Sequence, residues 1–169
     1  MLDDFNHCNK VMNKILSKRF YSENVAEIVV EAPLIARSRK AGHFVIVRVD
    51  EHGERMPLTI SDADVKQGTI TLVVQRIGVS SSKLCDLNAG DSVADLVGPL
   101  GKATDIRQFG TVVCACGGVG AAPMLPIAQA LKSAGNRVIT VLAARNKDLI
   151  ILYDQLAAVS DEVIVMTDD

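Results

Sequence analysis

Several features that mark particular classes of protein are missing from this sequence. It has no Trp, and aromatic residues make up only 4% of its 169 residues, so aliphatic side chains must fill the core. Its 18 Lys and Arg residues against 20 Asp and Glu residues give a net charge of -2, and no basic stripe interleaved with aromatic residues occurs. Because nucleic-acid binding needs such a basic footprint, we expect none here.

The N-terminus lacks the features of a secretory signal. Acidic residues stand in MLDDFNHCNK where a signal peptide needs basic ones, and no apolar run follows. We therefore expect a cytoplasmic protein. The apolar share of 49% is ample for a packed core, and the length suits one large domain or two small ones.

The four cysteines, at positions 8, 85, 114 and 116, include no CxxC pair. Their spacing indicates neither a zinc site nor a disulfide framework. Cys114 and Cys116 stand two residues apart on an expected strand and so share one face, where small buried apolar side chains are the simplest interpretation. His7 beside Cys8 could bind a metal ion, and a disordered terminus is the alternative.

From Lys14 to about Leu100 the sequence has the pattern of short β-strands. In VAEIVVE the two acids fall on one face, and Ala26, Ile28 and Val30 fall on the other. One short helix is expected at SSSKLCDL. Six runs of this kind, separated by turn residues, predict a small antiparallel barrel. The runs are NKILSKRFYS, NVAEIVVEAP, GHFVIVRVD, MPLTISD, GTITLVVQRIG and DSVADLVGPLG.

After GPLGKATDI the pattern changes to strand, helix, strand, helix, strand. TVVCAC, RVITVLAA and EVIVMT are the expected strands. The first helix is AAPMLPIAQALKSAG, which Gly135 ends. The second is capped by Asn146 and places Leu149, Leu152, Tyr153, Leu156 and Val159 on one face. This alternation predicts an incomplete parallel βαβαβ unit with right-handed crossovers, beginning near residues 101–106.

The stretch from Gln108 to Leu131 is uncharged and long enough to span a bilayer. It nevertheless holds four glycines and two prolines where a strand, turn and helix need them. We therefore interpret it as a buried strand–helix unit and expect no membrane association.

Two turns in the sequence suit the binding of anions. Gly117, Gly118 and Gly120 lie between a buried strand and a helix, where glycines let backbone N–H groups approach a diphosphate. Pro123 stands where a Rossmann fingerprint has Gly or Ala, so a tight packing turn is the alternative. In GVSSSKL, three serines follow Gly78 before a helix, which predicts an anion site or an ordinary N-cap.

Arg145 follows the second strand of the α/β half, at the position where an acid would hold the ribose diol of NAD. An Arg there can bind a 2′-phosphate, which favours NADP, or can simply be a solvated strand end.

Four motifs in this order resemble the ferredoxin–NADP reductase superfamily: RMPLTI and GVSSSKL within a barrel, then GPLG, then a strand that leads to GGVGAAPM. Within it, the chain is most similar to electron-transfer subunits of the sulfide dehydrogenase or reduced-ferredoxin:NADP oxidoreductase type, related to the flavin subunit of dihydroorotate dehydrogenase. The resemblance runs from about Asn13 to Asp169. It implies an FAD-binding barrel domain over residues 1–103 and an incomplete NAD(P)-binding domain over residues 104–169.

The resemblance also implies a flavin site on the barrel. Thr59 would hydrogen-bond flavin N5 and is the residue to which we assign a catalytic role. Leu58 occupies the position of a stacking Tyr in plant-type reductases, and Arg55 stands one position before the usual pyrophosphate-binding Arg. The other implied flavin contacts are Pro57, Val74, Gln75, Gly78, Ser80, Ser81 and Ser82.

For NAD(H) or NADP(H), the resemblance implies contacts along the glycine turn and at two strand ends: Gly117, Gly118, Val119, Gly120, Ala122, Pro123, Met124, Arg145 and Asp168. Thr167-Asp168-Asp169 matches the start of a TDDGS-like turn. Members of the family continue with further strands and a cysteine cluster that holds a [2Fe–2S] centre. Because this sequence stops at the third strand, we expect a truncated chain or proteolytic fragment without that centre.

The function implied is that of a flavoprotein oxidoreductase, which moves hydride between NAD(P)H and FAD and passes electrons to an iron–sulfur partner. The expected partner is a larger flavin or iron–sulfur subunit, with a ferredoxin-type carrier as a further one. A non-catalytic, flavin-binding docking subunit that is active only in a complex is the alternative. An NAD-dependent dehydrogenase without flavin would leave the barrel without a role and lacks a His or Lys placed to act as an acid.

Overall fold

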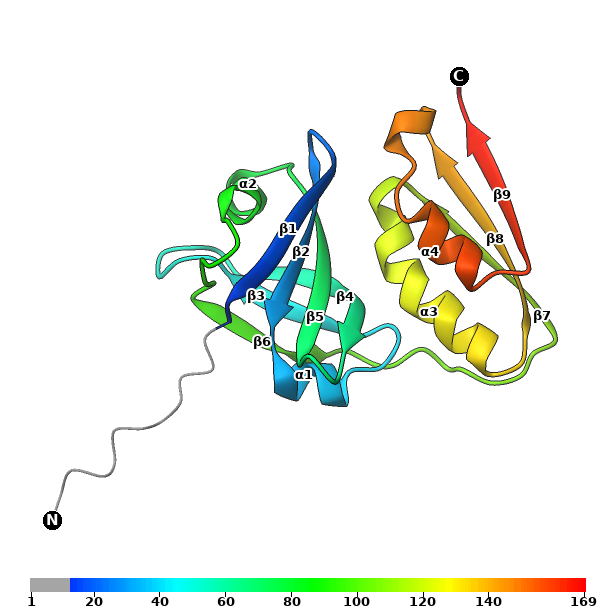
Figure 1. Cartoon of the computed structure of the whole chain (residues 1–169), viewed down its shortest axis with the longest axis horizontal. Coiled ribbons are helices and arrows are strands. Elements are labelled where there is room, and N and C mark those ends of the chain that lie inside the picture. The colour runs from blue at the N-terminus through cyan, green and yellow to red at the C-terminus, as the bar shows by residue number, and fades with distance from the viewer. Residues whose placement is uncertain (1–12) are drawn as a thin grey trace, which may run out of the picture.

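Two sheets make up the computed structural model, which describes residues 13–169 (Figure 1). One is a six-stranded antiparallel sheet and the other a three-stranded parallel sheet. All nine strands of these residues occur where runs of β-branched residues predict them, so the expected fold class is confirmed. His7 and Cys8, for which metal binding or a disordered terminus was considered, lie outside the described residues.

The antiparallel sheet curls into a barrel. Its strands pair in the order β1-β2-β5-β4-β3-β6, and Ile15 N donates to Asp91 O at 2.8 Å, which ties the start of β1 to the segment before β6. Ile28, Ile70 and Leu72 lie fully buried inside, so aliphatic side chains fill the interior as the composition predicts. The strands are β1 (Ile15–Ser22), β2 (Val25–Glu31), β3 (Phe44–Arg48), β4 (Met56–Asp64), β5 (Thr69–Gln75) and β6 (Asp95–Leu100).

Two short helices belong to the barrel half. The helix expected at SSSKLCDL is present as α2 (Val79–Asp86). The other, α1 (Pro33–Ser38), was not expected, because Pro33 stands at the end of the strand run NVAEIVVEAP. Proline at the first position of a helix loses no hydrogen bond, and the six residues are too few for a helical period to be recognised.

The parallel sheet pairs in the order β7-β8-β9, with α3 and α4 on the side that faces the barrel (Figure 1). Gly135, with a φ of +82°, follows the end of α3 as expected. The elements are β7 (Thr111–Gly117), η1 (Gly118–Gly120), α3 (Ala121–Ser133), β8 (Arg137–Ala144), η2 (Lys147–Leu149), α4 (Tyr153–Ala158) and β9 (Glu162–Thr167). The proposed domain boundary between residues 103 and 104 falls in the connection between β6 and β7.

The single helix expected after Asn146 is divided into two pieces. Asn146 caps as expected, since its side-chain oxygen accepts from Leu149 N at 3.2 Å. The chain leaves the helical path at Ile150, which is extended, and resumes it after Leu152, which has a φ of +59°. Ile151 and Leu152 are both buried, and one continuous helix would direct these neighbours to different sides.

The two halves share part of a hydrophobic core. Val25 of β2 and Val73 of β5, both on the outer face of the barrel, pack with buried residues of α3, α4 and the parallel sheet, such as Leu125 and Leu156. The α/β half is therefore fixed against the barrel. Within the described residues, no helix is long and apolar enough to cross a membrane.

Candidate functional site

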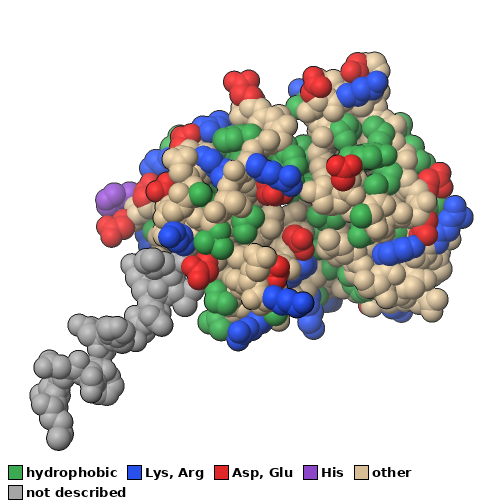
Figure 2. Space-filling model, in the orientation of Figure 1, with side chains coloured by type: hydrophobic (Ala, Val, Ile, Leu, Met, Phe, Trp, Pro, Cys, Tyr) green, Lys and Arg blue, Asp and Glu red, His purple; other side chains and the backbone are tan. Residues whose placement is uncertain are grey.

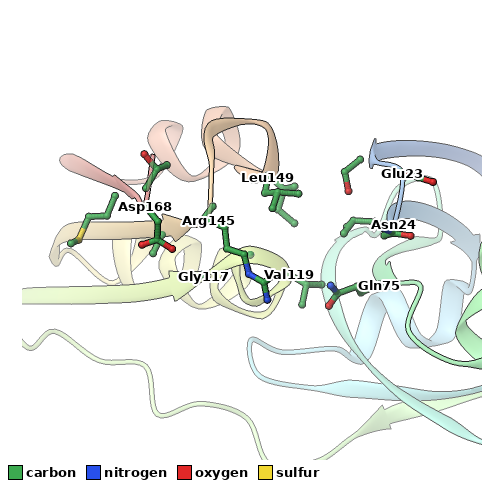
Figure 3. A pocket seen from close by; sticks show the side chains of 16 residues that line it. Glu23, Asn24, Gln75, Gly117, Val119, Arg145, Leu149 and Asp168 are labelled. Atoms are coloured by element: carbon green, nitrogen blue, oxygen red, sulfur yellow. The ribbon is translucent and has the colours of Figure 1, made fainter.

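A cleft of about 810 Å³ lies between the barrel and the parallel sheet (Figure 3). On one side, the carboxyl ends of all three parallel strands line it, where α/β folds bind ligands. On the other side lie Ser22–Val25, from the β1–β2 hairpin, and Gln75 at the end of β5. Both halves of the chain therefore form this site.

The glycine turn borders the cleft at the end of β7. Gly117, Gly118 and Val119 line it, and Gly118 has a φ of +51°, which favours glycine. A Cβ atom on Gly117 would make an ordinary van der Waals contact with Ala143 O at 3.4 Å, so the turn lies beside β8 without requiring glycine at that position. The turn leads into the thirteen-residue α3, whose first turn has no acidic residue. Its N-terminus thus suits an anion.

The other predicted residues of the turn occupy different positions. Gly120 precedes α3 directly, and Pro123 is the third residue of that helix, where its missing N–H costs little. Ala122 is buried in the shared core, and Met124 packs against that core. Gly120, Ala122, Pro123 and Met124 do not line the cleft; their contacts with a coenzyme stay predictions.

Arg145 and Asp168 meet at the edge of the cleft, after β8 and β9. Asp168 N donates to Arg145 O at 3.3 Å, and both residues line the cleft, with Arg145 pointing toward Val119 (Figure 3). Within residues 13–169, no ion pair involves Arg145. Directly after β8 the chain has Arg145 in place of an acid, but the neighbouring strand β9 is followed by the acid Asp168.

On the barrel, Thr59 lies where β4 changes partner. Residues 56–59 pair with β3, and from Ile60 onward the strand pairs with β5. Thr59 is half-buried and stands opposite Phe44. Pro57 is exposed, whereas Leu58 is half-buried and packs against the barrel core. The side chains of Pro57 and Thr59 are thus on the outer side of the strand, and that of Leu58 is on the inner side.

The N-terminus of α2 has the donors that a diphosphate needs. The first helical hydrogen bond runs from Ser82 N to Gly78 O at 2.9 Å, so the N–H groups of residues 79–81 precede the helical ladder. Open space surrounds Gly78, and the first turn of α2 has no acid. This arrangement fits an extended diphosphate ligand such as FAD.

Two of the three serines of this turn make different side-chain hydrogen bonds. Ser81 Oγ accepts from the N–H of Gly78 at 3.0 Å and from that of Ile77 at 3.1 Å. Ser80 is buried, and its hydroxyl donates to the Glu54 carboxylate at 3.0 Å. Ser81 is therefore a capping residue, as one interpretation of the sequence had it.

Two further flavin-site predictions concern Arg55 and the end of β5. Arg55 lies 3.5 Å from the Asp95 carboxylate, which also accepts from Arg48. Val74 is 1% exposed inside the barrel, so its side chain is not available to a ligand. Gln75 is exposed and lines the cleft, and it is the residue that joins the predicted flavin set to the coenzyme set.

Ser22, Glu23 and Asn24 were not expected at the site. They form the tip of the β1–β2 hairpin, which by sequence alone is a polar turn. Their position beside the strand ends of the other half depends on how the halves pack, and no local pattern carries that information.

The cysteines of the α/β half are core residues. Cys114 is buried and Cys116 is half-buried against the shared core, as expected for small apolar side chains. Burial raises the pKa of both thiols, which keeps them protonated near neutral pH. Within the described residues, no group of three or more His, Cys, Asp or Glu side chains could hold a metal ion.

Comparison with known proteins gives close relatives, although no protein-family model matches the chain. The chain is 40% identical over 158 residues to the dihydroorotate dehydrogenase B (NAD(+)) electron-transfer subunit homolog of Thermotoga maritima, covering 94% of this chain and 56% of that protein. It is 39% identical, with a TM-score of 0.89, to a chain in the structure of an NADH-dependent reduced ferredoxin–NADP oxidoreductase, covering 93% of this chain and 57% of that one.

A more distant likeness shows the fold alone. A ferredoxin–NADP+ reductase from Neisseria gonorrhoeae, solved with bound FAD and NADP, is 20% identical with a TM-score of 0.73 and is matched over 91% of this chain and 66% of that one. The chain spans little more than half the length of the two nearer relatives.

The barrel and the attached parallel sheet, with a cleft between them, have the fold of the ferredoxin–NADP reductases. By sequence, the chain is a homologue of the electron-transfer subunits of dihydroorotate dehydrogenase B. The resemblance found in the sequence is confirmed.

Proposed function

We propose that the chain binds FAD on its barrel and NAD(P)H in the cleft, as the electron-transfer part of a flavoprotein oxidoreductase. The observation that carries this proposal is the shared cleft. Gln75 from the flavin set and Gly117–Val119 from the coenzyme set line the same cavity, so ligands on the two halves would meet there.

In this proposal, residues of the barrel bind and orient FAD. The N–H groups at the start of α2 would hold the diphosphate of FAD, with Arg55 nearby as a cation partly balanced by Asp95. The hydroxyl of Thr59, on the outer side of β4, would hydrogen-bond flavin N5. When bound, FAD supplies the redox chemistry by exchanging hydride with nicotinamide and releasing electrons singly.

The residues of the α/β half position the coenzyme. The glycine turn and the N-terminus of α3 would hold its diphosphate, and Arg145 and Asp168 would contact its ribose or phosphate groups. The shared core packs the barrel against this half, which would hold the two ligands at a fixed separation. Binding and orientation then suffice, because no side chain must act as a strong acid or base.

The partner in this proposal is a larger flavin or iron–sulfur subunit, and a ferredoxin-type carrier is a further candidate. The support is that the curated relatives are named electron-transfer subunits of dihydroorotate dehydrogenase B. The cytoplasmic location expected from the N-terminal residues stays a prediction.

A second candidate is a docking subunit that holds flavin without reacting with coenzyme by itself. What favours it is that the curated relatives are named electron-transfer subunits. The two candidates differ in whether NADH or NADPH reduces flavin bound to this chain.

The Thr59 hydroxyl tests the proposed function. We expect Thr59→Val to keep bound FAD but to slow its reduction by NAD(P)H about tenfold, the effect of losing one hydrogen bond of ordinary strength. The measurement is stopped-flow absorbance of the FAD-loaded chain under anaerobic conditions. Thr111→Val is the matched control, because Thr111 is exposed at the opposite end of β7 from the glycine turn. Equal reduction rates in Thr59→Val and the unaltered chain would count against the assigned role.

A further inference from the structure

The β1–β2 hairpin is held firmly at the edge of the cleft. Asn24 O accepts from Arg76 N at 2.8 Å, and Val25 pairs with Gln75 and is buried in the shared core. β1 also contacts η2, the turn that directly follows Arg145 and Asn146. Figure 1 shows the hairpin tip at the same end of the molecule as the arrowheads of β8 and β9. The tip therefore stands opposite the strand ends.

The charges that line the cleft do not favour the additional phosphate that NADP carries on its adenosine ribose. Arg145 is its basic lining residue, and Glu23 and Asp168 are its acidic ones. Glu23 comes from the hairpin and Asp168 from the end of β9 (Figure 3). The lining carries one positive and two negative side chains, so the cation after β8 is outnumbered.

Each coenzyme would meet these charges differently. The adenosine ribose of NAD has two hydroxyls, and a carboxylate can accept hydrogen bonds from such a diol. NADP has a phosphate at one of these positions, which adds about −1.5 to −2 charge near neutral pH. Carboxylates that accept hydrogen bonds from the diol therefore repel the phosphate of NADP, and this repulsion offsets the attraction between that phosphate and Arg145.

We propose, on the basis of the proposed function, that Glu23 of the barrel hairpin is a specificity-determining residue that favours NAD(H) over NADP(H). The residue that selects the coenzyme thus belongs to the barrel, the half proposed to hold flavin. It lines the cleft opposite the end of β8, where Arg145 by itself would favour NADP. Arg76 N donates to the carbonyl of Asn24, which fixes the backbone beside Glu23, and Glu23 itself lines the cleft.

The test is binding of the oxidised coenzymes, so that flavin reduction does not interfere. Calorimetric titration of the FAD-loaded 169-residue chain with NAD+ and with NADP+ gives the two dissociation constants and their ratio. We expect the unaltered chain to bind NAD+ more tightly. Glu23→Gln should reduce this preference about tenfold, and Glu23→Lys should reverse it. The preference should also weaken in high salt, because screening weakens charge repulsion.

Glu31→Gln is the matched control, since Glu31 is exposed at the other end of β2 and its loss changes the net charge equally. It should leave the ratio unchanged. A ratio in Glu23→Gln within twofold of the unaltered chain would overturn the role of the hairpin while leaving the proposed function intact. An unaltered chain that holds FAD but binds neither coenzyme would overturn the proposed function, and this inference with it.

Discussion

The two halves of the chain bury the apolar faces of their sheets in different ways. The barrel closes on itself, and its core contains buried residues from its own strands and helices. Within residues 13–169, the parallel sheet is covered on one face only, and its core includes Val25 and Val73 of the barrel. On its other face, Val113 and Met166 are 64% and 57% exposed. The barrel is thus the self-sufficient half, and the α/β half depends on it.

The same asymmetry appears in the candidate sites. The proposed flavin contacts all belong to the barrel half, whereas the coenzyme cleft needs strand ends from one half and a hairpin from the other. On the face visible in Figure 2, Lys and Arg side chains are interspersed with Asp and Glu side chains. Substitutions that disturb the contact between the two halves should therefore weaken coenzyme binding more than flavin binding.

Truncating one core at a time gives the largest effect. We expect Leu72→Ala in the barrel and Leu156→Ala in the shared core each to lower the free energy of unfolding by about 3 kcal/mol, because both side chains are at most 1% exposed. Leu72→Ala should also weaken FAD binding, whereas Leu156→Ala should weaken coenzyme binding alone. Urea unfolding and FAD titration at low temperature measure these quantities. Equal loss of FAD in both variants would remove the distinction between the halves.

Substitution within the glycine turn has a smaller effect and separates the two ligands. Gly118→Ala should cost about 1 kcal/mol, because its φ of +51° disfavours a side chain, and coenzyme affinity should fall about fivefold without change in FAD binding. Gly120→Ala is the control, since Gly120 has a φ of -63° and open space around its Cβ position. Similar affinities of the two variants for the coenzyme would argue against a role for the special conformation of Gly118.

The smallest expected effect is the pH dependence of stability that comes from Glu27, on the outer face of the barrel. Burial acts to raise the pKa of Glu27, but hydrogen bonds from Arg19, at 2.7 and 2.9 Å, and from Tyr21 outweigh it and leave the pKa lowered. A lowered pKa stabilises the fold above the ordinary pKa of Glu, and this contribution disappears as the pH falls through the folded-state value. Tyr21 packs against the shared core, so the cluster reports on the junction of the halves.

We expect Glu27→Gln to destabilise the chain by less than about 1 kcal/mol at neutral pH and by progressively less as the pH falls below about 4. Thermal unfolding at several pH values measures the difference, with Glu31→Gln as the control. A difference between Glu27→Gln and the unaltered chain that stays constant down to acid pH would exclude the ionised carboxylate as its source.

Much of the fold could be predicted because its signals are local. Runs such as TITLVVQ and RVITVLAA are rich in β-branched residues, and their elements occur as β5 and β8. The helix after Asn146 could not be delimited, since burial of the adjacent Ile151 and Leu152 depends on the tertiary core. The short α1 carries too few residues for a periodic signal.

The site could be predicted less completely. The glycine turn and Arg145 are recognisable from strand and turn patterns, and both line the cleft. The inward position of Val74 follows from alternation with Ile70 and Leu72 and was available in the sequence. Glu23 and Asn24 were not, because a two-residue polar turn has no signal for what packs opposite it.

The most direct test of the central claim is the absorbance spectrum of the FAD-loaded chain, recorded anaerobically before and after addition of NADH or NADPH. If the two halves bring flavin and coenzyme together in one cleft, the absorbance of oxidised flavin disappears on addition of coenzyme. Bound flavin that keeps its spectrum with both coenzymes would contradict the account and favour a docking subunit, and a chain that binds no flavin would contradict both candidates.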